Sequence, residues 1–121
     1  MLVRVKILRN KDVKLIIAFI PPGHRHVRVA LGFDEEVIVL QQATIDALIR
    51  AYAEVALHPK RVAVKLVSRR LSKHERKGGF AEYQLLEVDE SEEQVLREAL
   101  QIYYGSDETH ATDSNEEHAT D

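Results

Sequence analysis

The residues of this chain that could do chemistry are mainly cationic, and nearly half of these cations are concentrated in one stretch. Eight Lys and Arg residues lie between Lys60 and Lys77, where Glu75 is the only acidic residue. Guanidinium and ammonium groups at this density bind phosphate backbones. The stretch leads through Gly78-Gly79 to Phe80, an aromatic ring that can stack on an unpaired base. This pattern predicts a surface that binds nucleic acid, single-stranded DNA or RNA rather than duplex, with little sequence preference.

We expect phosphate contacts from the basic side chains of this stretch and stacking from Phe80. Two arginines nearer the N-terminus are expected as outlying contacts. The complete predicted interface is Arg25, Arg28, Arg61, Lys65, Arg69, Arg70, Lys73, Arg76, Lys77 and Phe80. The alternative is a solvated cationic face whose charges are paired with the many glutamates of the chain.

Charge is segregated along the chain. A second basic stretch, from Arg4 to Arg28, holds seven Lys and Arg residues and one acid, Asp12. Residues 106–121 hold six carboxylates and no Lys or Arg, so the net charge of −3 hides seventeen positive and fourteen negative charges in residues 1–105. We therefore predict a compact basic domain over residues 1–105 and a disordered acidic tail over 106–121. The tail either competes with nucleic acid, recruits a protein partner, or is a solubilising extension.

Two histidines suggest a different chemistry. His24 and His26 are two residues apart, so on an extended segment their imidazoles point to the same side, as in half of a metal site. The arginines beside them disfavour a divalent cation, and we expect no metal, no cofactor and no catalytic residue. A second hypothesis is an enzyme for a phosphorylated or nucleotide substrate, in which these histidines meet Glu82 or Glu87. A third is a non-catalytic subunit or assembly factor of a larger complex.

Four strands are predicted in the N-terminal half of the chain. Their apolar residues alternate with polar ones or form short β-branched runs. Pro21-Pro22-Gly23 and Asp34-Glu35 are turn sequences between them. The predicted strands are Val3–Ile7, Val13–Ile20, His26–Phe33 and Glu36–Leu40.

The C-terminal half is predicted to hold two helices and two strands. Thr44 is a candidate N-cap for the first helix, and Ser91 with Gln94 forms a capping box for the second, which Gly105 ends. A polar loop, Ser68–Gly79, separates the two strands. The predicted elements are the helix Thr44–Leu57, the strands Arg61–Val67 and Phe80–Val88, and the helix that begins after Ser91.

The order β-β-β-β-α-β-β-α predicts an α+β fold in two layers. We expect one mostly antiparallel sheet of about six strands, with both helices on one face. The 121-residue chain is 45% apolar and has no cysteine, which excludes disulfides and cysteine nucleophiles. Since no apolar run approaches the roughly 20 residues of a membrane span, we expect a cytoplasmic protein without a membrane partner. We also expect a homo-oligomer, and the composition is typical of thermophile proteins.

Overall fold

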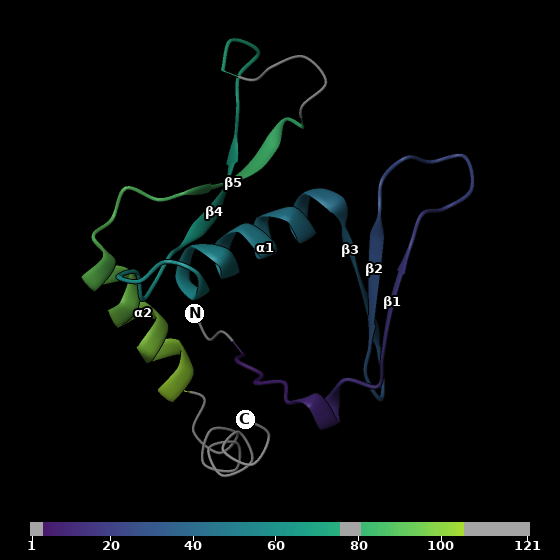
Figure 1. The fold of residues 1–121 in the computed structure, drawn as a ribbon, viewed down its shortest axis with the longest axis horizontal. Helices are drawn as coiled ribbons and strands as arrows, with labels where there is room; N and C mark the ends of the chain where they lie inside the picture. Colours follow the sequence, from purple (N-terminus) through teal and green to yellow (C-terminus); the bar gives the residue numbers. More distant parts are fainter. Residues whose placement is uncertain (1–3, 76–80, 106–121) are drawn as a thin grey trace. The chain divides into compact units, whose positions relative to one another are not determined.

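A computed structural model describes residues 4–75 and 81–105 of the chain. These residues form two compact units, and the acidic tail and the predicted contacts Arg76, Lys77 and Phe80 lie outside them. The first unit combines residues 4–39 with 97–105, and the second holds the rest, from residue 40 to residue 96. The elements are a 3-10 helix (Asn10–Asp12), β1 (Leu15–Phe19), β2 (Arg28–Gly32), β3 (Val37–Gln41), α1 (Gln42–Ala56), β4 (Leu66–Arg70), β5 (Tyr83–Glu87) and α2 (Glu92–Tyr104) (Figure 1).

The fold is α+β as predicted, but its strands form two antiparallel sheets instead of one sheet of about six strands. In the first sheet the order is β1-β2-β3, so β1 and β3 are edge strands. Ile17 of β1 lies opposite Ala30 of β2. The N–H of Phe33 donates to the carbonyl of Glu36 at 2.8 Å, which confirms the turn predicted between β2 and β3. The second sheet is the hairpin of β4 and β5.

The predicted strand Val3–Ile7 is wrong, because the described residues before Asn10 form no regular element. An alternating sequence becomes a strand only where a neighbouring edge accepts its backbone hydrogen bonds. The chain turns here instead. The carboxylate of Asp12 accepts hydrogen bonds from Arg9, from the backbone N at 3.0 Å and from Nε at 3.3 Å.

The strand predicted at Arg61–Val67 begins five residues later, at Leu66, and extends to Arg70. A carboxylate from a distant part of the chain explains the shift. Oε2 of Glu92 accepts the backbone N–H of Val62 at 2.7 Å and that of Ala63 at 3.2 Å. Backbone donors bound to a side chain are not available to a β ladder.

The helices follow the prediction closely. α1 begins at Gln42 with Gln41 as its N-cap, so the predicted cap at Thr44 is wrong. The capping box of α2 is confirmed, since the N–H of Gln94 donates to Oγ of Ser91 at 3.2 Å and the N–H of Ser91 donates to Oε1 of Gln94 at 3.1 Å. α2 ends at Tyr104, directly before the predicted glycine.

The buried core of the described residues is small. Its apolar members are Ala30, Ala47, Ala63, Leu71 and Val95, three of them alanines. Many larger apolar side chains are exposed, especially on β1, β3 and α1. Large exposed apolar surfaces mark interaction sites in folded proteins. None of the helices in the described ranges is long and apolar enough to cross a bilayer.

Candidate functional site

Arg61 of the predicted interface is the centre of an ion-pair network. Its Nη1 lies 2.9 Å from Oε2 of Glu54 on α1, and its Nη2 lies 2.7 Å from Oε2 of Glu87 on β5. The side chain is 25% exposed. The hydrogen bond to Glu87 raises the pKa of the guanidinium further, with Glu54 adding to it. Arg61 therefore connects the helix to the hairpin, and its charge is already neutralised.

Lys65 is also paired within the second unit. Its Nζ lies 3.4 Å from Oε2 of Glu90, and its side chain is partly buried. Together with Arg61, this lysine belongs to the structural base of the hairpin. Both cations are paired with carboxylates, so a phosphate contact at either one would have to displace its partner.

The distal end of the hairpin presents a more open set of cations. Arg69 Nη1 lies 3.2 Å from Oε2 of Glu75, and Arg70 Nε donates to Oε1 of Glu82. The two arginine side chains are 55% and 69% exposed. Exposed pairs of this kind contribute only about 0–1 kcal/mol, so a phosphate can displace the carboxylate at little cost.

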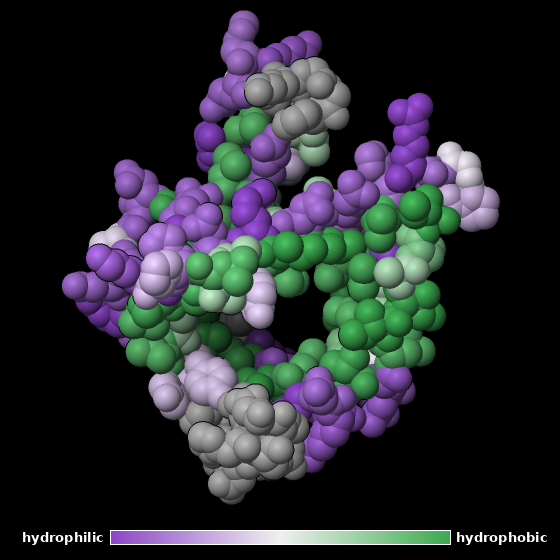
Figure 2. All heavy atoms as spheres, in the orientation of Figure 1, coloured by the Kyte–Doolittle hydropathy of each residue, from purple (hydrophilic) through white to green (hydrophobic). Residues whose placement is uncertain are grey.

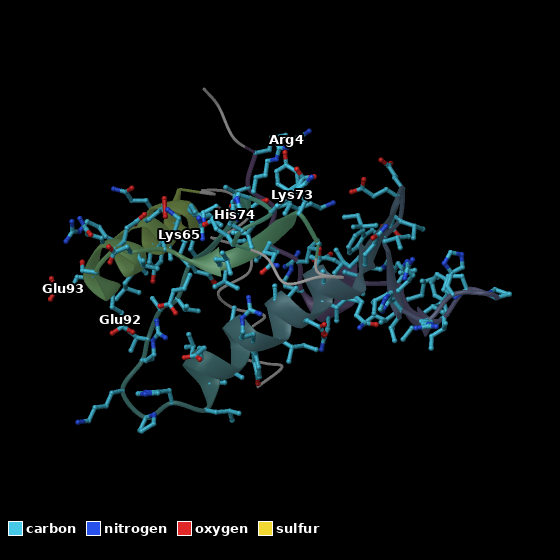
Figure 3. All side chains as sticks on the ribbon, turned by 90° about the horizontal axis from the view of Figure 1, so that it is seen from above. Arg4, Lys65, Lys73, His74, Glu92 and Glu93 are labelled. Atoms are coloured by element: carbon cyan, nitrogen blue, oxygen red, sulfur yellow. The ribbon has the colours of Figure 1, made fainter. Side chains whose placement is uncertain are left out.

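Lys73 completes this end of the hairpin. It is exposed and lies beside His74 in the turn that follows β4 (Figure 3). With Arg70 it lines an open pocket of about 390 Å³. Glu75 and Glu82 line the same pocket, so its charge is mixed. The backbone N–H of Ser72, followed by Arg69, lowers the pKa of Glu75, which keeps this carboxylate ionised.

The two outlying arginines belong to the first unit. Arg25 is exposed in the loop between β1 and β2. Arg28 starts β2 and donates from Nη1 to the carbonyl of His26 at 2.9 Å. Of the predicted interface, Arg70 and Lys73 line one pocket, and Arg69 is paired with Glu75 of the same pocket.

The histidines form no site in the described ranges. His24 and His26 are exposed in a loop of the first unit, while Glu82 and Glu87 belong to the second. No group of three or more His, Asp or Glu side chains with metal-site geometry is present in the described part of the chain.

The mixed-charge pocket beside Asp34 is lined partly by Lys6, whose Nζ lies 5.8 Å from the Phe33 ring centroid.

The first unit exposes many apolar side chains on its sheet, a surface that we did not predict as a site. We call the sheet β1–β3 the apolar sheet, because many of its exposed side chains are apolar; Figure 2 shows one side of this surface in green. All five residues of β1 are exposed, including Ile16 at 65% and Ile17 at 51%. On β3, Val39 is 53% exposed. Because neighbouring residues of a strand point to opposite faces, Ile16 and Ile17 expose one apolar face each.

The sequence contained a signal for this surface. Residues 15–20, which are β1 and the residue after it, read Leu-Ile-Ile-Ala-Phe-Ile, without the alternation of a strand that has one face in water. Continuous apolar runs are typical of strands that are covered on both faces. In the described residues the side chains of β1 are instead exposed.

The outer edges of the β4–β5 hairpin, unlike β1, carry charged side chains or an occupied backbone group. Nη2 of Arg50 on α1 donates to the carbonyl of Leu85 on β5 at 2.7 Å. β4 carries Arg69 and Arg70. Charged side chains and occupied backbone groups prevent a strand edge from pairing with another chain.

Comparison with known proteins adds no relative to this description. No family model matches the sequence, and neither the curated proteins nor the solved structures include a significant match.

Proposed function

We propose that this protein is a non-catalytic subunit that works by association, and that the apolar sheet is the surface through which it binds another protein. The observation that carries the proposal is the exposure of aliphatic side chains on both faces of β1 and β3. The proposal shares the non-catalytic subunit with the third hypothesis drawn from the sequence, but that hypothesis placed the contact on the basic surface, which would dock an acidic protein or structured RNA.

The energy of this surface supports the proposal. Complete burial of one Val, Leu, Ile or Phe side chain contributes about 1.5–3 kcal/mol. Seven such side chains of β1 and β3 are roughly half exposed: Leu15, Ile16, Ile17, Phe19, Val37, Ile38 and Val39. Burying the exposed half of these seven side chains would contribute on the order of 8 kcal/mol, which is comparable with the whole free energy of unfolding of a typical domain. A binding partner recovers this free energy.

Photo-crosslinking in the source cells tests the proposal. A benzoylphenylalanine at Ile16, on β1 of the apolar sheet, should give covalent adducts with protein upon illumination. The control is the same residue at Lys60, which is exposed but lies outside the sheet. Adducts at position 16 and none at position 60 support the proposal. Adducts at neither position, or equally at both, would contradict it.

A second candidate function is binding of single-stranded nucleic acid by the end of the hairpin. It is favoured by one observation, the exposure of Arg69, Arg70 and Lys73 around one turn. The pairing of Arg61 and Lys65 with glutamates reduces the number of available phosphate contacts. We therefore place this function second, with about three contacts instead of the larger number that the basic stretch predicts.

A further inference from the structure

The strands of the described residues present their outer edges in different ways. Arg50 occupies a carbonyl of β5, and β4 carries two arginines. β3 continues into α1 without a loop, since Gln41 is both its last residue and the N-cap of the helix. β1 has none of these features. Neither a charged residue nor a proline lies between Leu15 and Ile20.

An apolar, uncharged edge strand is a template for pairing with a further strand. We infer that the partner of β1 is β1 of a second copy of this chain, paired antiparallel about a two-fold axis at Ile17. This inference rests on the proposed function and names the partner of the apolar sheet. The two three-stranded sheets then join into one sheet of six strands.

The side chains of β1 are self-complementary in this register. Two-fold symmetry at Ile17 places each Leu15 opposite Phe19 of the second copy and each Ile16 opposite Ala18 of the second copy. Every cross-strand pair within Leu15–Phe19 is apolar. The symmetry also closes the assembly at two copies, because both chains use the same edge.

The charges at the ends of β1 select the antiparallel direction. Lys14 precedes the strand, and its Nζ donates to the carbonyl of Lys11 at 2.9 Å and lies 3.9 Å from Oδ1 of Asp34. Its charge is therefore held by its own unit. Antiparallel pairing brings Lys14 opposite Ile20 of the second copy. Parallel pairing would bring two Lys14 residues together, which like charges disfavour.

A pair of five-residue edges is a small contact. A standard interface buries about 800 Å² per partner, and smaller contacts are typical of weak, reversible complexes. We therefore expect a dimer that dissociates on dilution, and sedimentation velocity of the full chain measures this directly. A single monomeric species at every concentration up to about 100 μM would overturn the inference.

Single cysteines test the register, because the chain has no cysteine of its own. Only at position 17 does a residue face its own copy. Opposed Cβ atoms in an antiparallel pair lie about 4.5–5.5 Å apart, close enough for a disulfide after a small adjustment. Under mild oxidation the Ile17→Cys protein should therefore form a covalent dimer. Leu15→Cys should not, because its two copies are about 13 Å apart along the strands.

The controls for this experiment come from the same sheet. Val39→Cys introduces a thiol of almost equal exposure on the opposite edge strand, and it should stay monomeric. A mixture of Leu15→Cys and Phe19→Cys proteins should cross-link, because these positions face each other across the axis. Cross-linking of Val39→Cys or of Leu15→Cys alone, as fast as that of Ile17→Cys, would overturn the register.

Charged substitutions at position 17 give a second test of the dimer. Ile17→Lys should weaken the dimer about tenfold or more, since two lysines then face each other, while Val39→Lys should not. Ile17→Glu should weaken it similarly, and a mixture of the two variants should form a heterodimer. Circular dichroism of each variant checks that it is folded. If a lysine variant does not fold, the cysteine variants test the dimer instead.

Different outcomes would contradict the proposed function and the inferred second copy. Adducts at position 16 with a different protein, together with no disulfide at position 17, would overturn the second copy as partner and keep the proposed function. The absence of both adducts and disulfide would overturn both.

Discussion

Oε2 of Glu92 lies 2.7 Å from the backbone N of Val62, thirty residues earlier in the chain. The same oxygen accepts the N–H of Ala63 at 3.2 Å. One carboxylate at the start of α2 thus holds two consecutive amides of the segment before β4. The hydrogen bonds from Val62 and Ala63 lower the pKa of Glu92 below its ordinary value of 4.5.

Replacing Glu92 with Gln should lower the stability of the second unit, because two backbone donors lose a charged acceptor. The midpoint of urea unfolding at neutral pH measures the loss. Glu93→Gln is the matched control. Glu93 occupies the same first turn of the helix and is exposed (Figure 3), so its replacement should change the midpoint far less.

The stabilisation by Glu92 should depend on pH. A carboxylate whose pKa is lower in the folded state stabilises the fold fully above its unfolded pKa, and this contribution disappears as the pH falls through the folded value. The difference between the native chain and Glu92→Gln should therefore be largest above pH 4.5 and shrink in more acidic solution. A difference that stays constant, or grows, toward acid pH would contradict the assigned hydrogen bonds.

Arg61 should contribute more to stability, and Arg70 should contribute more to oligonucleotide binding. Arg61→Ala leaves Glu54 and Glu87 without their partner and should lower the urea midpoint clearly. Arg70→Ala removes an exposed pair and should lower it little. In an oligonucleotide-binding assay the order should reverse, with Arg70→Ala the more harmful change. Equal effects in both assays would show that the two arginines do not have separate roles.

Binding of single-stranded oligonucleotides should depend weakly on salt. With about three phosphate contacts, the logarithm of affinity should fall with the logarithm of salt concentration at a slope near −2. Fluorescence anisotropy with a labelled oligonucleotide measures the slope. Arg69→Ala, Arg70→Ala and Lys73→Ala should each reduce it by about 0.7, whereas Lys60→Ala, in the same basic stretch but off the hairpin, should not. No binding at low salt would exclude this function.

Gly32 makes room for Leu15 in the apolar sheet. A Cβ on Gly32 would lie 2.7 Å from Cγ of Leu15, which is the residue paired with it across β1 and β2. Gly32→Ala should cost about 1–3 kcal/mol of unfolding free energy through this overlap. In a Leu15→Ala background the cost should largely vanish, and a double-mutant cycle by urea unfolding measures the coupling. Additive effects would contradict the contact.

Local sequence signals predicted the elements that depend on neighbouring residues. The capping box of Ser91 and Gln94 and the turn before Glu36 both join residues three positions apart, and both are confirmed. The start of β4 was predicted five residues early because its determinant, Glu92, is far away in the sequence. The arrangement in two sheets depends on such distant contacts as well.

The candidate site shows the same limit. The density of cations in residues 60–77 is visible in the sequence, but their partners are not. Arg61 is neutralised by Glu87, twenty-six residues later, and Lys65 by Glu90, twenty-five residues later. The apolar run of β1 did indicate a strand covered on both faces, and its importance became clear only when the described chain left it exposed.

The bond between Arg50 and the carbonyl of Leu85 has a consequence for stoichiometry. A molecule with one adhesive edge stops growing as soon as that edge is occupied, whereas a molecule with two such edges continues into a filament. Loss of the Arg50 guanidinium would leave the carbonyl of Leu85 without this donor. The side chain of Arg50 therefore restricts the addition of a further strand at β5.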